Sequence, residues 1–136
     1  MPASRERAPT AAVVGLDACP TPAVDADRVA ATRDRLLDAG EAARLADLFR
    51  LLGDPGRIRI LFALLEAGEL CVCDLAATVG AAETSVSHAL RLLRTAGIVR
   101  NRRDGRNVFY SLDDAHVRLL LDLSREHLRH GDGAAR

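Results

Sequence analysis

Cysteine is rare in this sequence of 136 residues, and two of its three copies stand almost side by side, at Cys71 and Cys73. Two thiolates this close in sequence form half of a site for a soft or borderline divalent metal ion, and the adjacent Asp74 could add an oxygen ligand. Free cysteines are also common as small core residues. The third copy, Cys19, lies on a Pro-rich N-terminal segment that could supply a further thiolate. We therefore expect a thiolate metal site formed by Cys19, Cys71, Cys73 and Asp74.

A second group of metal-ligating residues, Asp114, His116, His127 and His130, lies near the C-terminus. On a helix, at about 100° per residue, His116 and His127 share a face, and His130 lies one turn beyond. His116 and His127 are separated by a rise of roughly 16 Å, too far for one metal ion to bridge. Two antiparallel copies of the helix could instead combine both ends into an intersubunit zinc site. The spacing also allows these histidines to be surface residues, with Asp114 as a helix cap.

Arginine provides every basic residue of the chain, and its distribution is uneven although the net charge is zero. Between Ala81 and Tyr110, six arginines against two acidic residues give a local charge of +4, as phosphate binding requires. Two short helices are predicted around this stretch, over 70–79 and 83–96, closed by Gly80 and Gly97. A helix, a glycine-containing turn and a second helix are typical of a helix-turn-helix DNA-binding motif.

The second of these helices is predicted to bury Val86, Leu90 and Leu93, which leaves its other face open to a DNA major groove. Directly after it, the segments 98–103 and 107–112 flank an Asp-Gly turn signal and predict a β-hairpin. A hairpin in this place is a wing that can grip the DNA backbone or minor groove. The candidate DNA-binding residues are Thr84, Ser85, Ser87, His88 and Arg91 on the helix and Arg102, Arg103 and Arg106 on the wing.

The remaining pattern predicts a mainly α-helical winged helix-turn-helix fold with this β-hairpin as the wing. Apolar spacing predicts further helices over 27–39, around 45–52, over 55–67 and from Asp113 onward. Asp54 and Pro55 are the start signals of the third of these. We expect residues 1–26 to be a flexible arm, residues 27–130 to be the DNA-binding and dimerisation domain, and residues 131–136 to be a C-terminal tail.

Several segments of the sequence resemble the ArsR/SmtB family of metal-sensing repressors. Together these segments extend over nearly the whole domain. They are Leu52–Arg57, Glu69–Ala76, Ser85–Leu93, Gly97–Val99 and Gly105–Leu112. The resemblance implies a homodimer whose first and last helices pack across the two-fold axis. It also implies that the metal-free dimer binds operator DNA and dissociates on binding Cd(II), Pb(II) or Zn(II), so that metal efflux or resistance genes are derepressed.

The resemblance extends to both groups of metal ligands. The zinc-site pattern in the last helix of family members is matched in full by Asp114, His116, His127 and His130. Cadmium- and lead-sensing members use two cysteines equivalent to Cys71 and Cys73 together with arm cysteines, of which this chain has only Cys19. Arsenic-sensing members carry a further cysteine where this chain has Ala76, so an arsenite-responsive repressor is the weaker alternative.

The same thiols leave a redox mechanism open, in which Cys71 or Cys73 is oxidised and Cys19 acts as the resolving partner. An enzyme is not expected, because a catalytic zinc needs an open coordination position that four protein ligands would close. The sequence has no transmembrane run, and the apolar stretch after Arg5 and Arg7 is too short for a signal peptide. We therefore expect a cytoplasmic protein with reduced cysteines and no membrane partner.

Overall fold

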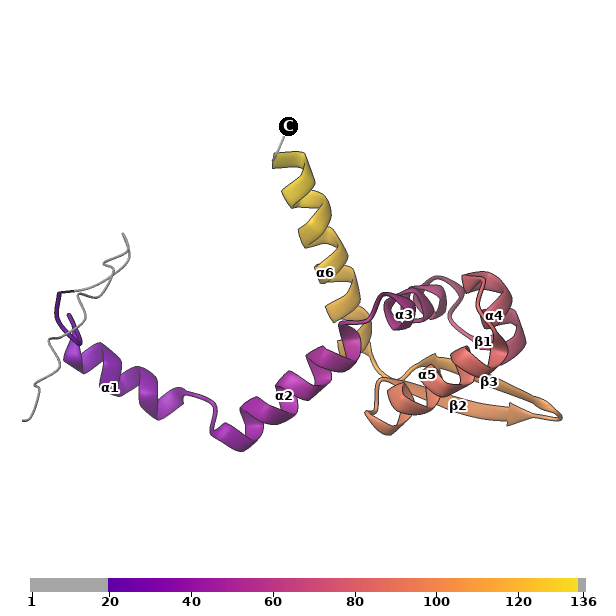
Figure 1. The fold of residues 1–136 in the computed structure, drawn as a ribbon, viewed down its shortest axis with the longest axis horizontal. Helices are drawn as coiled ribbons and strands as arrows, with labels where there is room; N and C mark the ends of the chain where they lie inside the picture. The colour runs from indigo at the N-terminus through magenta and orange to yellow at the C-terminus, as the bar shows by residue number, and fades with distance from the viewer. Residues whose placement is uncertain (1–19, 135–136) are drawn as a thin grey trace, which may run out of the picture. The chain divides into compact units, whose positions relative to one another are not determined.

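The computed structural model describes residues 20–134. The chain divides into two units, Met1–Asp38 and Ala39–Arg136. The first unit contains helix α1 (Ala26–Arg35). The second unit contains, in chain order, α2 (Ala39–Leu52), α3 (Pro55–Ala67), β1 (Leu70–Cys71), α4 (Val72–Val79), α5 (Glu83–Thr95), β2 (Val99–Asp104), β3 (Asn107–Leu112) and α6 (Ala115–Ala134) (Figure 1).

Helix α1 is shorter than the sequence predicts. It begins after Asp25, whose carboxylate accepts a hydrogen bond of 3.0 Å from the backbone N–H of Arg28. It ends at Arg35 rather than near residue 39, because Leu36 already has extended backbone angles (φ −68°, ψ 148°). Gly40, expected to separate two helices, instead lies in the first turn of α2, where backbone N–H groups have no intrahelical acceptor.

A capped glycine turn joins α2 to α3, as predicted. Asp54 Oδ2 accepts a hydrogen bond of 2.9 Å from the backbone N–H of Arg57, and Pro55 takes the first helical position, where its missing N–H leaves no hydrogen bond unmade. The Arg57 side chain also donates from Nε to the carbonyl oxygen of Leu51 at 2.6 Å. This bond satisfies a carbonyl at the end of α2 and so helps to fix the direction of α3.

The segment before α4 is a strand, which corrects the prediction of a helix from residue 70. Leu70 and Cys71 form β1 and pair antiparallel with Tyr110 and Phe109 of β3, so that the sheet order is β1-β3-β2. A lone hairpin would leave one edge of β3 with unpaired backbone N–H and C=O groups, and β1 pairs with part of that edge. Helix α4 then starts at Val72.

Two glycines form the turns of the predicted DNA-binding motif. Gly80 ends α4 with left-handed backbone angles (φ 67°, ψ 39°), which residues with a side chain rarely adopt. Gly105 (φ 60°) and Arg106 form the two-residue loop between β2 and β3, where Asp104 pairs with Asn107. The helix-turn-helix and the hairpin are therefore confirmed.

Aliphatic side chains hold the elements of the second unit together. Helices α3, α4 and α5 and the sheet share one core, whose fully buried side chains include Leu61, Leu64, Leu75, Leu90 and Leu93. Removing side chains of this size from water stabilises a fold by about 1.5–3 kcal/mol each. The predicted buried face of α5 is confirmed, because all three of its expected apolar residues lie in this core.

Helix α6 continues to Ala134, past residue 130, where we expected the helical domain to end. Among its leucines Leu121 is buried, whereas Leu119, Leu123 and Leu128 are exposed. No helix within residues 20–134 combines the length and the apolar character that crossing a membrane requires.

Candidate metal sites and nucleic-acid interface

The thiol pair lies at the junction of β1 and α4. Cys71 ends β1 and its side chain is buried, whereas Cys73 in the first turn of α4 is exposed. The two Sγ atoms are 3.1 Å apart. Ligand atoms of Cys71, Cys73 and Asp74 lie within 4.8 Å of one another, the only such group of three or more in the described part of the chain. Three of the four expected thiolate-site residues are thus adjacent, and Cys19 lies outside the described residues.

Hydrogen bonding shifts the titration of the Cys71 thiol. The pKa of the Cys71 thiol is raised, chiefly because the thiol shares a hydrogen bond with Cys73 and further because of the Asp74 carboxylate, while the Asp74 backbone N–H acts in the opposite direction. A raised pKa keeps the thiol protonated near neutral pH, so a metal ion that binds here must displace the proton. Two sulfurs and one carboxylate oxygen, open to solvent at Cys73, are donors that fit Cd²⁺, Pb²⁺ or Zn²⁺.

The four expected ligands of α6 form two separate pairs. At its start, Asp114 Oδ1 accepts a hydrogen bond of 3.0 Å from the Val117 backbone N–H and lies 3.7 Å from His116 Nδ1. The hydrogen bond from Val117, aided by His116, lowers the pKa of Asp114 and keeps it ionised. His127 and His130 are exposed near the other end of the helix. In a single chain the four candidate ligands therefore lie as one pair at the start of α6 and one pair near its other end.

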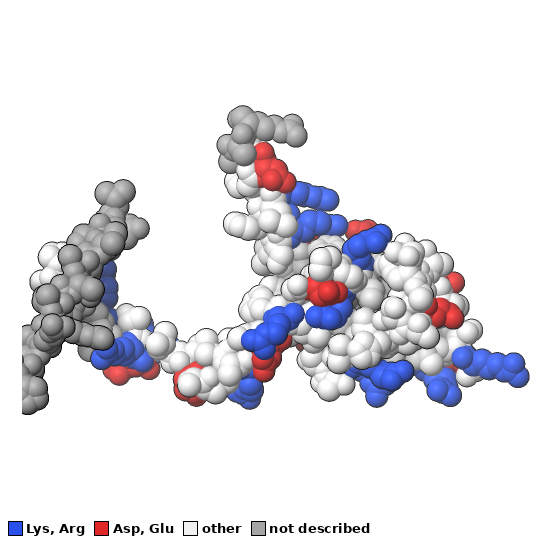
Figure 2. All heavy atoms as spheres, in the orientation of Figure 1, with Lys and Arg blue, Asp and Glu red and all other residues white. Residues whose placement is uncertain are grey.

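The exposed side of α5 carries the predicted DNA-binding residues. Thr84, Ser85, His88 and Arg91 are exposed, and Ser87 is half-buried. Figure 2 shows arginines gathered along the α5 side of the second unit and at the tip of the hairpin.

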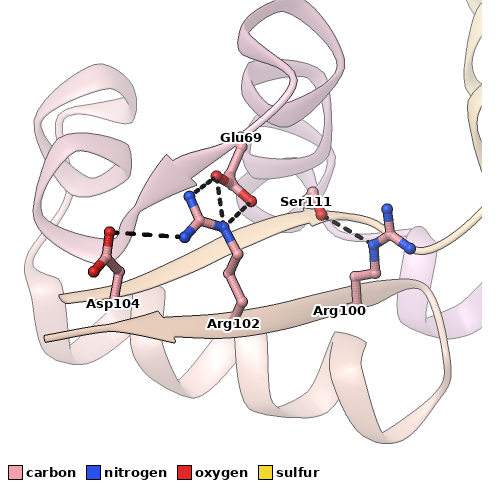
Figure 3. A network of polar contacts seen from close by, with 5 residues as sticks. All are labelled: Glu69, Arg100, Arg102, Asp104 and Ser111. Carbon is pink, nitrogen blue, oxygen red and sulfur yellow. Dashed lines mark hydrogen bonds and ion pairs between the residues drawn. The ribbon is translucent and has the colours of Figure 1, made fainter.

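Two of the wing arginines differ from the third. Arg103 and Arg106 are exposed, and neither makes an ion pair with any residue between 20 and 134. Arg102, by contrast, is engaged within the chain. Its Nε lies 2.9 Å from Glu69 Oε2 (Figure 3). Its guanidinium carbon lies 4.6 Å from the centroid of the Phe109 ring.

Sequence reasoning did not single out Glu69, which binds Arg102 across 33 positions of the chain. The only available signal was its place two residues before Cys71. In an extended segment, residues two apart point to the same side. Because a helix was expected from residue 70, Glu69 and Cys71 were not expected to point to the same side.

Comparisons with known proteins identify relatives over most of the chain. Residues 54–101 match the family model described as "Bacterial regulatory protein, arsR family". A "Transcriptional repressor SmtB homolog" from Synechocystis sp. is 42% identical over 114 residues, which are 84% of this chain and 86% of that protein. A "Cadmium resistance transcriptional regulatory protein CadC homolog" from Staphylococcus aureus is also 42% identical, over 62% of this chain and 70% of that protein.

Solved structures share the fold. The crystal structure of the AntR antimony-specific transcriptional repressor matches with a TM-score of 0.66 and 36% identity, over 72% of this chain and 88% of that chain. The solution structure of the homodimeric winged helix-turn-helix domain Mb0332 from Mycobacterium bovis matches with a TM-score of 0.58 and 30% identity, over 79% of this chain and 94% of that chain.

The fold and its exposed basic helix define a winged helix-turn-helix protein. The chain belongs to the arsR family of bacterial regulatory proteins, as its relatives over most of its length show. It is therefore a DNA-binding transcriptional regulator and not an enzyme.

Proposed function

We propose that this chain is a cytoplasmic, metal-responsive repressor that binds its operator as a metal-free homodimer and dissociates on binding Cd²⁺, Pb²⁺ or Zn²⁺. The observation that carries the proposal is the 3.1 Å Sγ–Sγ distance between Cys71 and Cys73, with Asp74 beside them. These donors lie at the start of α4, the first helix of the DNA-binding motif. A ligand bound there acts directly on the element that supports α5. Relatives named for cadmium resistance and for SmtB support derepression of metal efflux or resistance genes.

The proposed DNA contacts divide between helix and wing. Helix α5 enters the major groove with its exposed residues Thr84, Ser85, His88 and Arg91. Its small polar side chains allow close approach to base edges. Arg103 and Arg106 at the exposed end of the hairpin contact phosphates or the minor groove. The third wing candidate, Arg102, is instead bound by Glu69 of the same chain.

A second copy of this chain is the proposed partner of an apolar groove between α2, α3 and α6. The groove is lined mainly by apolar side chains, among them Phe49, Phe62, Leu121 and Leu128. Phe49 is 57% exposed and Leu128 68% exposed in the single chain. Large exposed apolar patches are typical of association surfaces. The homodimeric relative Mb0332 supports self-association as the way in which this groove is covered.

Dimerisation would also complete the histidine site. With two α6 helices antiparallel, Asp114 and His116 of one protomer meet His127 and His130 of the other, and two-fold symmetry gives two such sites. Three imidazoles and a carboxylate suit tetrahedral zinc. The thiolate site is proposed to prefer cadmium and lead, with Cys19 as a further ligand.

A thiol-redox mechanism is the less supported alternative. The thiolate is the form that reacts with oxidants, and the raised pKa of Cys71 lowers its population at neutral pH. Resistance of operator binding to peroxide, together with its loss on addition of metal, would separate the two mechanisms.

Metal titration of an operator complex tests the proposal. A duplex selected from a random library by the purified, reduced protein serves as the operator, with fluorescence anisotropy as the readout at constant ionic strength. We expect Cd²⁺, Pb²⁺ or Zn²⁺ to weaken binding by about 5- to 150-fold, the usual range of allosteric coupling. Mg²⁺ is the control, because it prefers oxygen ligands and near-octahedral geometry. Equal operator affinity with and without all three metals would refute the proposal.

A further inference from the structure

One cross-strand row of the sheet joins the thiol pair to the wing. The register places Cys71 of β1 opposite Phe109 of β3, and Phe109 opposite Arg102 of β2. Residues directly opposite each other in an antiparallel sheet point to the same face. The three side chains therefore lie in one line across one face of the sheet, with a metal-ligand candidate at one end and a wing arginine at the other.

Arg102 contacts Phe109, Glu69 and Asp104, with 3.9 Å between Arg102 Nη1 and Asp104 Oδ2. Its guanidinium stacks over the Phe109 ring at 4.6 Å. Its Nε lies 3.0 Å and 2.9 Å from the two carboxylate oxygens of Glu69 (Figure 3). A second guanidinium nitrogen also binds Glu69 Oε1, so the contact is two-pronged. The hydrogen bond lowers the pKa of Glu69 and raises that of Arg102, so both groups stay charged over the physiological range.

Neighbouring wing residues point the other way. Side chains alternate along a strand, so Arg103 lies on the face opposite Arg102. That opposite face includes Val99 and its cross-strand partner Leu112, both buried in the core that α5 shares. Arg103 thus extends the face against which α5 packs, whereas Arg102 lies on the face that carries the thiol pair.

Metal binding would change the distance between the two sulfurs at the Cys71 end of this row. Two cysteine sulfurs at about 2.3 Å from one tetrahedral ion are roughly 3.8 Å apart, whereas the Sγ atoms of Cys71 and Cys73 are 3.1 Å apart here. Cys71 belongs to a strand of only two residues, so little backbone pairing resists its displacement. A displacement of β1 would move Phe109, because Cys71 pairs with it in the sheet. It would also move Glu69, because that residue directly precedes β1 in the chain.

We propose that Glu69 and Arg102 form a latch that transmits metal binding at Cys71 and Cys73 to the wing. Arg102 is then a positioning residue for metal-driven release rather than a contact to DNA. The inference rests on the proposed function, because release by metal is what the latch transmits.

Two single substitutions, Glu69→Gln and Arg102→Gln, test the latch in the full-length reduced protein. The readout is the ratio of operator affinity without metal to that with saturating Cd²⁺, and cadmium–thiolate absorbance confirms that the site is filled. In the parent protein we expect a ratio of about ten or more. In both variants we expect it to fall to about three or less, while metal-free operator affinity and Cd²⁺ affinity change by less than about threefold. In the double variant this ratio should be no lower than in either single variant, because the two residues act through one contact.

Arg103→Gln is the matched control, since it removes a neighbouring wing charge from the other face. It should weaken metal-free operator binding and reduce the salt dependence while leaving the release ratio unchanged. Thermal unfolding confirms that all variants are folded.

Three outcomes would overturn the latch, and they have different meanings. A Glu69→Gln protein that keeps the parent ratio shows that Glu69 transmits nothing. An Arg102→Gln protein that loses metal-free affinity as Arg103→Gln does shows that Arg102 is a DNA contact. If the operator affinity of the parent protein is the same with and without every metal, there is no metal response for the latch to transmit, and the proposed function is refuted as well.

Discussion

The two candidate metal sites of this chain are built in opposite ways. Cys71, Cys73 and Asp74 are brought together by one local event, the change from strand to helix at Val72, and their ligand atoms lie within 4.8 Å of one another. The ligands of α6 are spread along one straight element. Asp114 Oδ1 and His116 Nδ1 lie 3.7 Å apart at one end of this element, and His127 and His130 lie near the other end.

Because of this difference, metal binding at the two sites depends on the oligomeric state in different ways. A site whose first three donors are brought together by local backbone geometry presents them in any oligomeric state and acts first on its own chain. A site divided between two ends of a helix forms only when two copies are correctly aligned, so metal binding there reports on the dimer and reshapes it. Three sets of substitutions test the comparison.

The largest effect is expected from Leu128→Arg in the apolar groove of α6. A charge there should prevent dimerisation, because burying an unpaired guanidinium is costly. Zinc affinity of the histidine site should fall by more than about a hundredfold, since even second-shell changes at metal sites cost about 10- to 100-fold. Cadmium–thiolate absorbance should persist. Sedimentation velocity and parallel metal titrations provide the measurements.

Arg118→Ala is the control, because Arg118 is exposed on the same helix and does not line the groove. It should remain dimeric and bind zinc normally. If Leu128→Arg stays dimeric, the groove is not the association surface. If it becomes monomeric and keeps full zinc affinity, the histidine site is not intersubunit.

A smaller and opposite effect is expected from Cys73→Ser. Loss of one thiolate should weaken Cd²⁺ binding by about 10- to 100-fold and leave zinc binding at α6 unchanged. Because Cys73 is exposed, Tm should barely change. Cys71→Ser should weaken Cd²⁺ similarly but also lower Tm by a few degrees, because it places a hydroxyl where a buried thiol was. Equal Tm for both variants would contradict the difference in burial.

The smallest effect distinguishes the two roles of Asp114. Asparagine caps helices as well as aspartate does, so Asp114→Asn should keep Tm and weaken only zinc binding, by about tenfold. Asp114→Ala should do the same to zinc and lower Tm by a few degrees, because the bond to the Val117 N–H is lost. Calorimetry of both variants measures stability and zinc binding. Unchanged zinc affinity in both would leave Asp114 as a cap alone.

Local signals in the sequence predicted most of the fold. Asp54 and Pro55 marked the start of α3, Gly80 the turn between α4 and α5, and Gly105 the hairpin, because each of these residues acts through its own backbone or that of its neighbours. The same logic was wrong at Gly40, since a glycine in the first turn of a helix breaks no intrahelical bond.

Strand β1 could not be predicted from local sequence signals. Its two residues carry no alternating pattern that could distinguish a strand from the first turn of a helix, and only the exposed edge of β3, some forty positions later, makes a strand of them. The identities and spacing of Cys71, Cys73, Asp114 and the α6 histidines were therefore determined by the sequence alone, as was the exposed face of α5. Tertiary structure decided that Cys71 is buried and Cys73 is not, and that Glu69 meets Arg102. Those outcomes depend on sheet register, which joins residues too far apart along the chain for local preferences to specify.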